Sequence, residues 1–198
     1  MKKIIILAVA AIFALPTVSM AQKNTAIHTD YVGVYGKKSH NLDVWYQGDI
    51  LAGFAICSKK IDTDFSCPFV STTHGVRITE YAFIGAGAGF QYVYGDISAG
   101  NEASKTWDTL LIPVFANVKA YYPIKNVAPY LTLDVGGTFV ATANSDVYPN
   151  KPSGGLYCKF GVGVDYKHFM VDLGVMHHEL ESINHSSNSF YVNIGYRF

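Results

Sequence analysis

The sequence predicts an all-β fold, an eight-stranded antiparallel up-and-down transmembrane β-barrel, and three observations lead to it. The chain of 198 residues has 14 Tyr, 12 Phe and 18 Gly, yet only 15% of its residues are charged, a composition that favours strands over helices. Apolar and polar residues alternate along eight long segments, which is the period of a strand with two different faces. The connections between segments are alternately short and long, as in barrels that cross a membrane.

The first part of the chain is expected to lie outside this barrel. Two lysines, the apolar run IIILAVAAIFAL and the sequence SMAQ follow one another near the start, which is the pattern of a secretory signal peptide cleaved between Ala21 and Gln22. We therefore expect a signal peptide at 1–21, a periplasmic lead-in at 22–41 and the barrel domain at 42–198. Removing the two lysines of the signal from the 15 basic residues leaves 13 against 15 acidic residues, so nothing indicates nucleic acid as a partner.

The first four strands are predicted from the apolar residues at every second position. The first run reads LDVWYQGDILAGFAIC, with Leu, Val, Tyr, Ile, Ala and Phe on one side and Asp, Trp and Gln on the other. The second has Arg77 on its polar side, and the third alternates Gly with Ala and aromatic residues. The fourth contains Pro113, which removes a ladder donor, but this residue lies near the outer end of the segment, where a bulge is tolerable, so the strand is retained. These strands are expected at 42–57, 67–78, 82–95 and 109–122.

The last four strands follow the same rule. The fifth and seventh carry Asp134 and Asp172 opposite rows of Leu, Val and Phe, and the sixth carries Lys159 and Asp165 opposite such a row. The eighth reads FYVNIGYRF and is apolar at every second position up to its final residue. Each segment is near or above the ~9–11 residues that a tilted strand needs to cross a bilayer. These strands are expected at 129–142, 155–166, 169–180 and 189–198.

The charged residues indicate which face of each strand meets lipid. When the more apolar parity of each segment is taken as one face, that face contains no Asp, Lys or Arg, and its one Glu is Glu179 near the end of the seventh segment. A soluble β-sandwich also alternates, but its outer face carries many Lys, Glu and Thr, whereas here the polar face is rich in Gly and its charges nearly balance. This suits a narrow lumen, where an unpaired charge is costly. The predicted lumen charges are Asp43, Asp49, Arg77, Lys119, Asp134, Lys159, Asp165, Asp172 and Arg197.

The barrel region resembles the small outer-membrane β-barrel family of OmpA/OmpX-like type, a porin-family group of Gram-negative cell envelopes. The resemblance is carried by THGVRITEYAFIGAGAGF, IPVFANVKAYYPIKNVAPYLTLDVGG, GVGVDY and YVNIGYRF. It implies the cell outer membrane as location and outer-membrane lipid as surroundings. It also implies that the barrel-assembly machinery reads the terminal strand, through Val192, Ile194, Tyr196 and Phe198. These motifs specify architecture rather than activity, because the family includes structural, adhesion and defence proteins and small pores.

Two cysteines flank the first long connection. Cys57 and Cys67 both have the parity of the lumen face, and an exported protein meets conditions in which disulfides form. A bridge between them is one interpretation and two free thiols are the other, because sequence alone does not fix connectivity. Cys158 has the parity of the apolar face and is read as a small hydrophobic residue.

Two groups of residues after residue 176 contain side chains of the types found in metal-binding or catalytic sites. One group contains residue types that bind metals; its members are His177, His178, Glu179, Glu181 and His185. Because neighbouring residues on a strand point to opposite faces, His177 and His178 cannot easily bind one ion, and we expect these side chains to be solvated polar residues of a loop. The other, HSSN at 185–188, is similar to the His-x-Ser-Asn motif of the outer-membrane lipid A deacylases, where a downstream Glu orients the His. No Glu follows Ser187 here. We therefore expect no catalytic residue, no cofactor and no metal.

The expected function is that of a non-enzymatic integral outer-membrane barrel. An eight-stranded interior is filled by side chains, so its role would be structural or would lie in adhesion or defence through extracellular loops that bind an unidentified ligand. One alternative is a small outer-membrane pore, which would conduct ions. The other is a lipid A-modifying barrel enzyme, whose activity would depend on Ser187.

Overall fold

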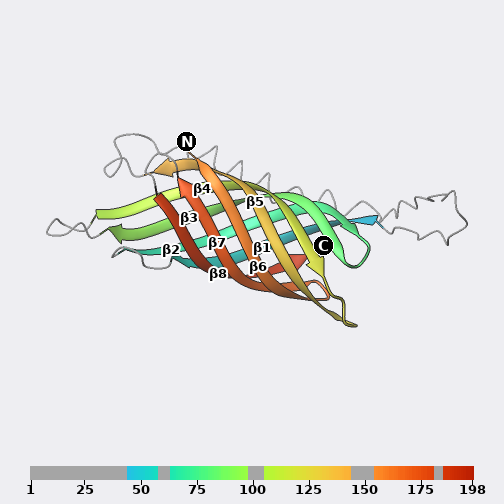
Figure 1. Ribbon diagram of the computed structural model, residues 1–198. Helices are drawn as coiled ribbons and strands as arrows, with labels where there is room; N and C mark the ends of the chain where they lie inside the picture. Colours follow the sequence, from blue (N-terminus) through green and yellow to red (C-terminus); the bar gives the residue numbers. More distant parts are fainter. Residues whose placement is uncertain (1–43, 58–62, 98–104, 144–153, 181–184) are drawn as a thin grey trace, which may run out of the picture.

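A computed structural model describes residues 44–57, 63–97, 105–143, 154–180 and 185–198. Its strands form one closed barrel in which each strand is antiparallel to both neighbours and β8 returns to β1 (Figure 1). The predicted fold class is thereby confirmed. The strands are β1 (Val44–Cys57), β2 (Thr63–Ile78), β3 (Ala82–Ile97), β4 (Lys105–Tyr121), β5 (Val127–Ala143), β6 (Gly155–Tyr166), β7 (Phe169–Leu180) and β8 (His185–Arg197).

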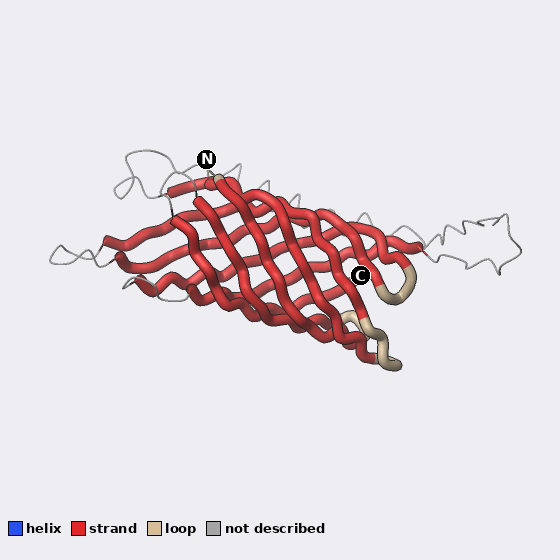
Figure 2. The backbone as a smooth tube through the Cα atoms, viewed as in Figure 1, coloured by secondary structure: helices blue, strands red, loops and turns tan. Residues whose placement is uncertain are grey.

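The strands are joined at one end by three short turns, which Figure 2 shows as tan segments, and we call this the short-turn end. Strand ends there agree with the sequence-based bounds to within two residues. At the opposite end, β2, β4 and β8 each begin four residues earlier than predicted, at Thr63, Lys105 and His185. The reason is that backbone pairing continues after the apolar alternation stops: Asp64 still pairs with Asp96. Hydrogen bonding in a ladder does not require apolar side chains.

Pro113 lies inside β4, close to two irregularities in the strand pairing. The ladder between β3 and β4 is interrupted between the pairs Ala88↔Val114 and Gln91↔Leu111. On the other side of β4, the register with β5 shifts between Leu110 and Leu111. A proline has no N–H to donate to a ladder, so a local irregularity of this kind accommodates it.

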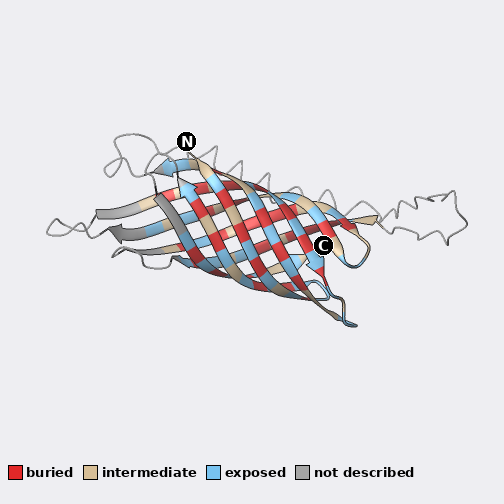
Figure 3. Ribbon diagram, viewed as in Figure 1, coloured by how far each residue is buried: buried red, intermediate tan, exposed pale blue. Residues whose placement is uncertain are grey.

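Exposure alternates along every strand with the sense opposite to that of a soluble protein. On β5, Leu131 and Leu133 are 50% and 41% exposed, whereas the intervening Thr132 and the following Asp134 are 3% and 1% exposed. Figure 3 shows this alternation of exposed and buried residues over the whole wall. The apolar residues thus point outward and the polar residues point into the lumen. None of the described residues belongs to a helix long and apolar enough to span a membrane.

Candidate functional site: the barrel lumen

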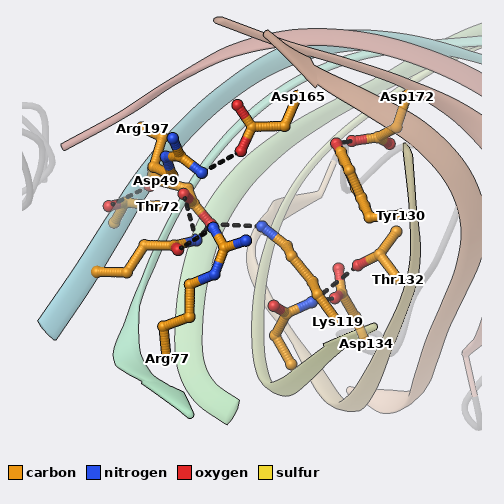
Figure 4. Close-up of polar contacts among 12 residues, drawn as sticks. Asp49, Thr72, Arg77, Lys119, Tyr130, Thr132, Asp134, Asp165, Asp172 and Arg197 are labelled. Atoms are coloured by element: carbon orange, nitrogen blue, oxygen red, sulfur yellow. Dashed lines mark hydrogen bonds and ion pairs between the residues drawn. The ribbon is translucent and has the colours of Figure 1, made fainter. Parts of the chain in front are cut away.

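Two ion pairs lie fully inside the barrel. Lys119 of β4 binds Asp49 of β1, and the Nζ of Lys159 on β6 lies 2.9 Å from the Oδ2 of Asp134 on β5. None of the four side chains is more than 2% exposed. A second donor supports each acid, because Gln47 donates to Asp49 at 3.1 Å and Asn117 donates to Asp134 (Figure 4). Buried carboxylates therefore have both a counter-charge and a hydrogen-bond donor, which buried charges require.

A third ion pair lies near the short-turn end. Arg197 of β8 binds Asp165 of β6 and also donates to the backbone carbonyl of Lys167. Its side chain is 23% exposed, whereas that of Asp165 is only 2% exposed. Lys167 has a φ of 60° in the turn between β6 and β7, so the arginine also fixes the carbonyl of a strained turn residue.

Among the described contacts, two lumen charges have neutral partners and no ion pair. Arg77 donates to Gln47 at 3.3 Å and to the carbonyl of Glu80 at 2.8 Å, and its guanidinium lies 3.9 Å from the centre of the Tyr121 ring. Stacking on an aromatic ring stabilises a guanidinium that is hidden from water. Asp172 accepts a hydrogen bond of 2.7 Å from the hydroxyl of Tyr130.

The structure thus places eight of the nine predicted lumen charges inside the barrel, and Asp43 lies outside the described residues. Sequence reasoning missed Tyr121 and Tyr130, which act as neutral partners of a cation and an anion. A tyrosine at lumen parity in a segment that also carries charges is the signal that points to such a role.

Aromatic rings fill the space that lumen glycines leave open. A Cβ atom at Gly87 would lie 2.7 Å from the ring of Phe115, one at Gly85 would lie 2.7 Å from the ring of Phe83, and one at Gly163 would lie 2.5 Å from the ring of Tyr130. The glycine-rich polar face of the sequence therefore exists because rings from the same or neighbouring strands pack onto the bare backbone.

These rings, with a few aliphatic and sulfur-containing side chains, form two apolar layers. The layer near the short turns consists of Phe83, Tyr121, Tyr130 and Met170. The layer near the other end consists of Ala55, Cys67, Phe69, Phe115, Tyr157, Met176 and Tyr191. The pair Lys159–Asp134 and the buried Asn193 belong to strand segments between these layers. Within the described residues, these two layers of buried side chains occupy the lumen at two levels.

The disulfide between Cys57 and Cys67 stays a prediction. Cys67 is buried in the lumen layer and lies directly opposite Ala55 in the ladder. Cys57 is two residues further along β1, and its side chain is outside what the structure describes. Diagonal neighbours of this kind have Cα atoms ~7–8 Å apart, more than the usual spacing of a bridge. Cys158 is half-buried at outward parity, as the sequence indicates.

In the part of the chain that the structure describes, the residues considered for metal binding do not converge. His178 is buried in the lumen with its ring 5.2 Å from that of Tyr157, while His177 points outward to Asn188 at 2.7 Å. Among the described residues, no three possible metal ligands gather. Glu181 and the side chains of His185 and Ser187 lie outside the described residues, so the expectation that the deacylase-like motif is not catalytic stays a prediction.

The terminal strand closes the barrel against β1. Gly48 and Phe198 exchange two backbone hydrogen bonds of 2.9 Å, and the ring of Phe198 covers Gly48 so closely that a Cβ there would lie 2.6 Å from the ring Cζ. The three other residues proposed to be read during assembly point outward and are 41–65% exposed; they are Val192, Ile194 and Tyr196.

Comparisons with known proteins add similarities of fold. Neither a family model nor a curated protein sequence matches this chain. Neisserial surface protein A is 16% identical, with 77% of this chain and 95% of that chain covered and a TM-score of 0.49. The outer membrane enzyme PagL is 12% identical, with 74% and 97% covered and a TM-score of 0.48. Ail, the attachment invasion locus protein of Yersinia pestis, solved with the heparin analogue sucrose octasulfate, is 15% identical, with 77% and 99% covered and a TM-score of 0.48.

Proposed function

We propose that this protein is a non-enzymatic integral barrel of the cell outer membrane. Its role is structural or lies in surface interaction, such as adhesion or defence, through the connections at the end of the barrel opposite the short turns. The observation that carries the proposal is the combination of an apolar outer wall with a lumen closed by aromatic layers and buried ion pairs.

The outer wall supports a lipid environment. Exposed apolar side chains continue from strand to strand, for example Leu173 on β7 at 57%, Ile194 on β8 at 65% and Phe160 on β6 at 49%. Soluble monomers rarely expose continuous apolar patches of more than a few hundred Å². A closed ladder also leaves no unpaired strand edge, which is a condition for lying in hydrocarbon. Outer-membrane lipid is therefore the proposed partner of this wall.

Two further partners, the barrel-assembly machinery and a surface ligand, are proposed from the terminal strand and from the long connections. The outward row of β8 from Val192 to Phe198 is the segment that we propose the barrel-assembly machinery reads. The connections between β1 and β2, β3 and β4, β5 and β6, and β7 and β8 lie outside the described residues. We assign the unidentified surface ligand to them because connecting loops diverge freely and carry binding function.

Outer-membrane fractionation and reconstitution into planar bilayers test this function together. The wild-type protein is expected in the outer-membrane fraction, with no single-channel steps, because the lumen is packed. Lipid A of overexpressing cells is expected to keep its acylation, and Ser187→Ala is expected to behave as the wild type. Reproducible conductance steps would instead establish the pore. Lipid A that changes with the wild type but not with Ser187→Ala would establish the enzyme.

A further inference from the structure

A small polar group interrupts the apolar outer wall on β1 and β2. The Tyr46 hydroxyl lies 2.5 Å from the Nδ1 of His74, and the Nε2 of His74 lies 3.0 Å from the Oγ1 of Thr72. All three have outward parity, between the lumen residues Gln47 and Thr73 on the same strands. The Phe198 ring stands edge-on to His74, with ring centres 6.0 Å apart. Ionisable groups on a lipid-facing wall are rare and suggest a function.

Hydrogen-bond geometry determines where the protons of this group lie. The Thr72 hydroxyl donates its single proton to the backbone carbonyl of Asp49 at 3.0 Å. Its oxygen must then accept from the Nε2–H of His74, which leaves Nδ1 as an acceptor. Tyr46 consequently donates to Nδ1. Every donor of the group is used internally, and the Tyr46 oxygen, on a side chain that is 40% exposed, keeps its lone pairs for an external donor.

An apolar hollow lies beside this polar group on the same face. Its volume is about 10 Å³, the space of roughly one water molecule, and its side-chain walls are Ile50 of β1, Val70 of β2, and Ala88 and Phe90 of β3. Thr72 contributes to both the hollow and the polar group. We call the hollow together with Tyr46, Thr72 and His74 the β1–β3 notch.

The polar and apolar parts of the notch follow one another along the barrel, as the polar headgroup and the apolar acyl chains do in a lipid molecule. Tyr46 and His74 are nearer the short-turn end, and Ile50 and Val70 lie four residues further along the same strands. Four residues of a strand span about 13 Å, which is roughly 10 Å in depth for a strand tilted by about 40° and lies within the ~15 Å of hydrocarbon in one leaflet. Outer-membrane barrels have their short turns on the periplasmic side, so a lipid of the periplasmic leaflet would have this orientation, with its headgroup toward the short turns.

We infer that the β1–β3 notch binds one glycerophospholipid of the periplasmic leaflet whose headgroup carries an amine. One methylene or methyl group of an acyl chain enters the hollow while the rest of the chain lies along the apolar wall, and the ammonium group donates a hydrogen bond to the Tyr46 oxygen. An anionic headgroup gains less, because the described contacts of Tyr46, Thr72 and His74 include no Lys or Arg. The inference rests on the proposed function, since it requires the outer wall to face lipid.

Lipid retention tests the inference with two probes, phosphatidylethanolamine and phosphatidylcholine, which differ in whether the headgroup nitrogen carries N–H donors. The purified full chain is reconstituted in vesicles of equimolar phosphatidylethanolamine and phosphatidylcholine, extracted in mild detergent, and weighed by native mass spectrometry. One phosphatidylethanolamine is expected to remain bound in preference to phosphatidylcholine, which has no N–H donor. Tyr46→Phe keeps the ring and removes the acceptor, so the preference is expected to fall about fivefold, the effect of one hydrogen bond.

A matched pair of alanines controls for the wall itself. Ala88→Leu fills the hollow and is expected to lower retention of both lipids, whereas Ala116→Leu, at outward parity on the neighbouring strand β4, is expected to retain lipid as the wild type does. Equal retention by these two variants, or an unchanged preference in Tyr46→Phe, would overturn the inference. Flotation of the same vesicles separates the two proposals: a protein that does not float with the vesicles contradicts the proposed function as well, whereas one that floats without lipid preference contradicts the notch alone.

Discussion

Replacing Lys119 by methionine is expected to destabilise the folded barrel by about 3–5 kcal/mol, the usual effect of leaving a buried charge without its partner. The carboxylate of Asp49 would keep the hydrogen bonds from Gln47 but lose its only described ion-pair partner. Neither side chain of the pair is more than 1% exposed, so water cannot take over. The free energy of unfolding of the protein in lipid vesicles, measured by urea titration, reports the loss.

Two further variants separate charge burial from general damage. The double variant Asp49→Asn with Lys119→Met removes both charges and is expected to recover most of the lost stability, because hydrophobic or neutral replacements of a whole pair are often tolerated. Lys167→Met, in an exposed turn, is expected to change stability by no more than about 0.5 kcal/mol. A Lys119→Met protein as stable as Lys167→Met would contradict the buried pair.

Gly87→Val is expected to destabilise the barrel by about 3 kcal/mol, the upper part of the range for overpacking a filled interior. A Cβ at Gly87 would lie 2.7 Å from two ring atoms of Phe115 and 2.6 Å from the carbonyl oxygen of Thr72. The ring is 4% exposed and belongs to the larger apolar layer, so it has no room to move away. The same vesicle-based urea titration measures the effect.

The neighbouring residue gives the matched control. Ala86 points outward, so Ala86→Val is expected to be nearly neutral although it adds valine to the same strand. In a Phe115→Ala background, Gly87→Val is expected to cost less than in the wild type, because the two sites share one space and their effects are coupled. Equal costs for Ala86→Val and Gly87→Val would show that ring-on-glycine packing does not fill the lumen.

The number of strands and the face of each residue were predictable because a strand has a period of two. A charge at Asp134 or Lys159 on the polar parity already places that side chain in the lumen. The partner was not predictable, since it depends on the stagger between strands: Asp134 lies opposite Asn117 on one side and Lys159 on the other. The stagger also brings Lys119 to Asp49, which is 70 residues away in sequence.

The ring positions and the notch were harder to predict for a related reason. The sequence shows Gly87 and Phe115 at lumen parity, but only the closed barrel brings this ring over this glycine. His74 has the parity of the apolar face, and a histidine there was the available signal for the β1–β3 notch. Its partner Tyr46 is 28 residues away and reaches it across the β1–β2 ladder. The residues of the four long connections show no such periodicity, so the sequence does not predict which of them bind a ligand.

Fluorescence quenching by brominated acyl chains tests most directly whether the apolar face meets lipid. Trp45 and Trp107 are replaced by Phe, and a single tryptophan is introduced either at Phe160, which points outward and is 49% exposed, or at Phe115, which points inward and is 4% exposed. In vesicles of brominated phosphatidylcholine, the tryptophan at 160 is expected to be strongly quenched and the one at 115 to keep most of its emission. Strong quenching at 115 with none at 160, or none at either position, would contradict a lipid-facing wall around a packed lumen.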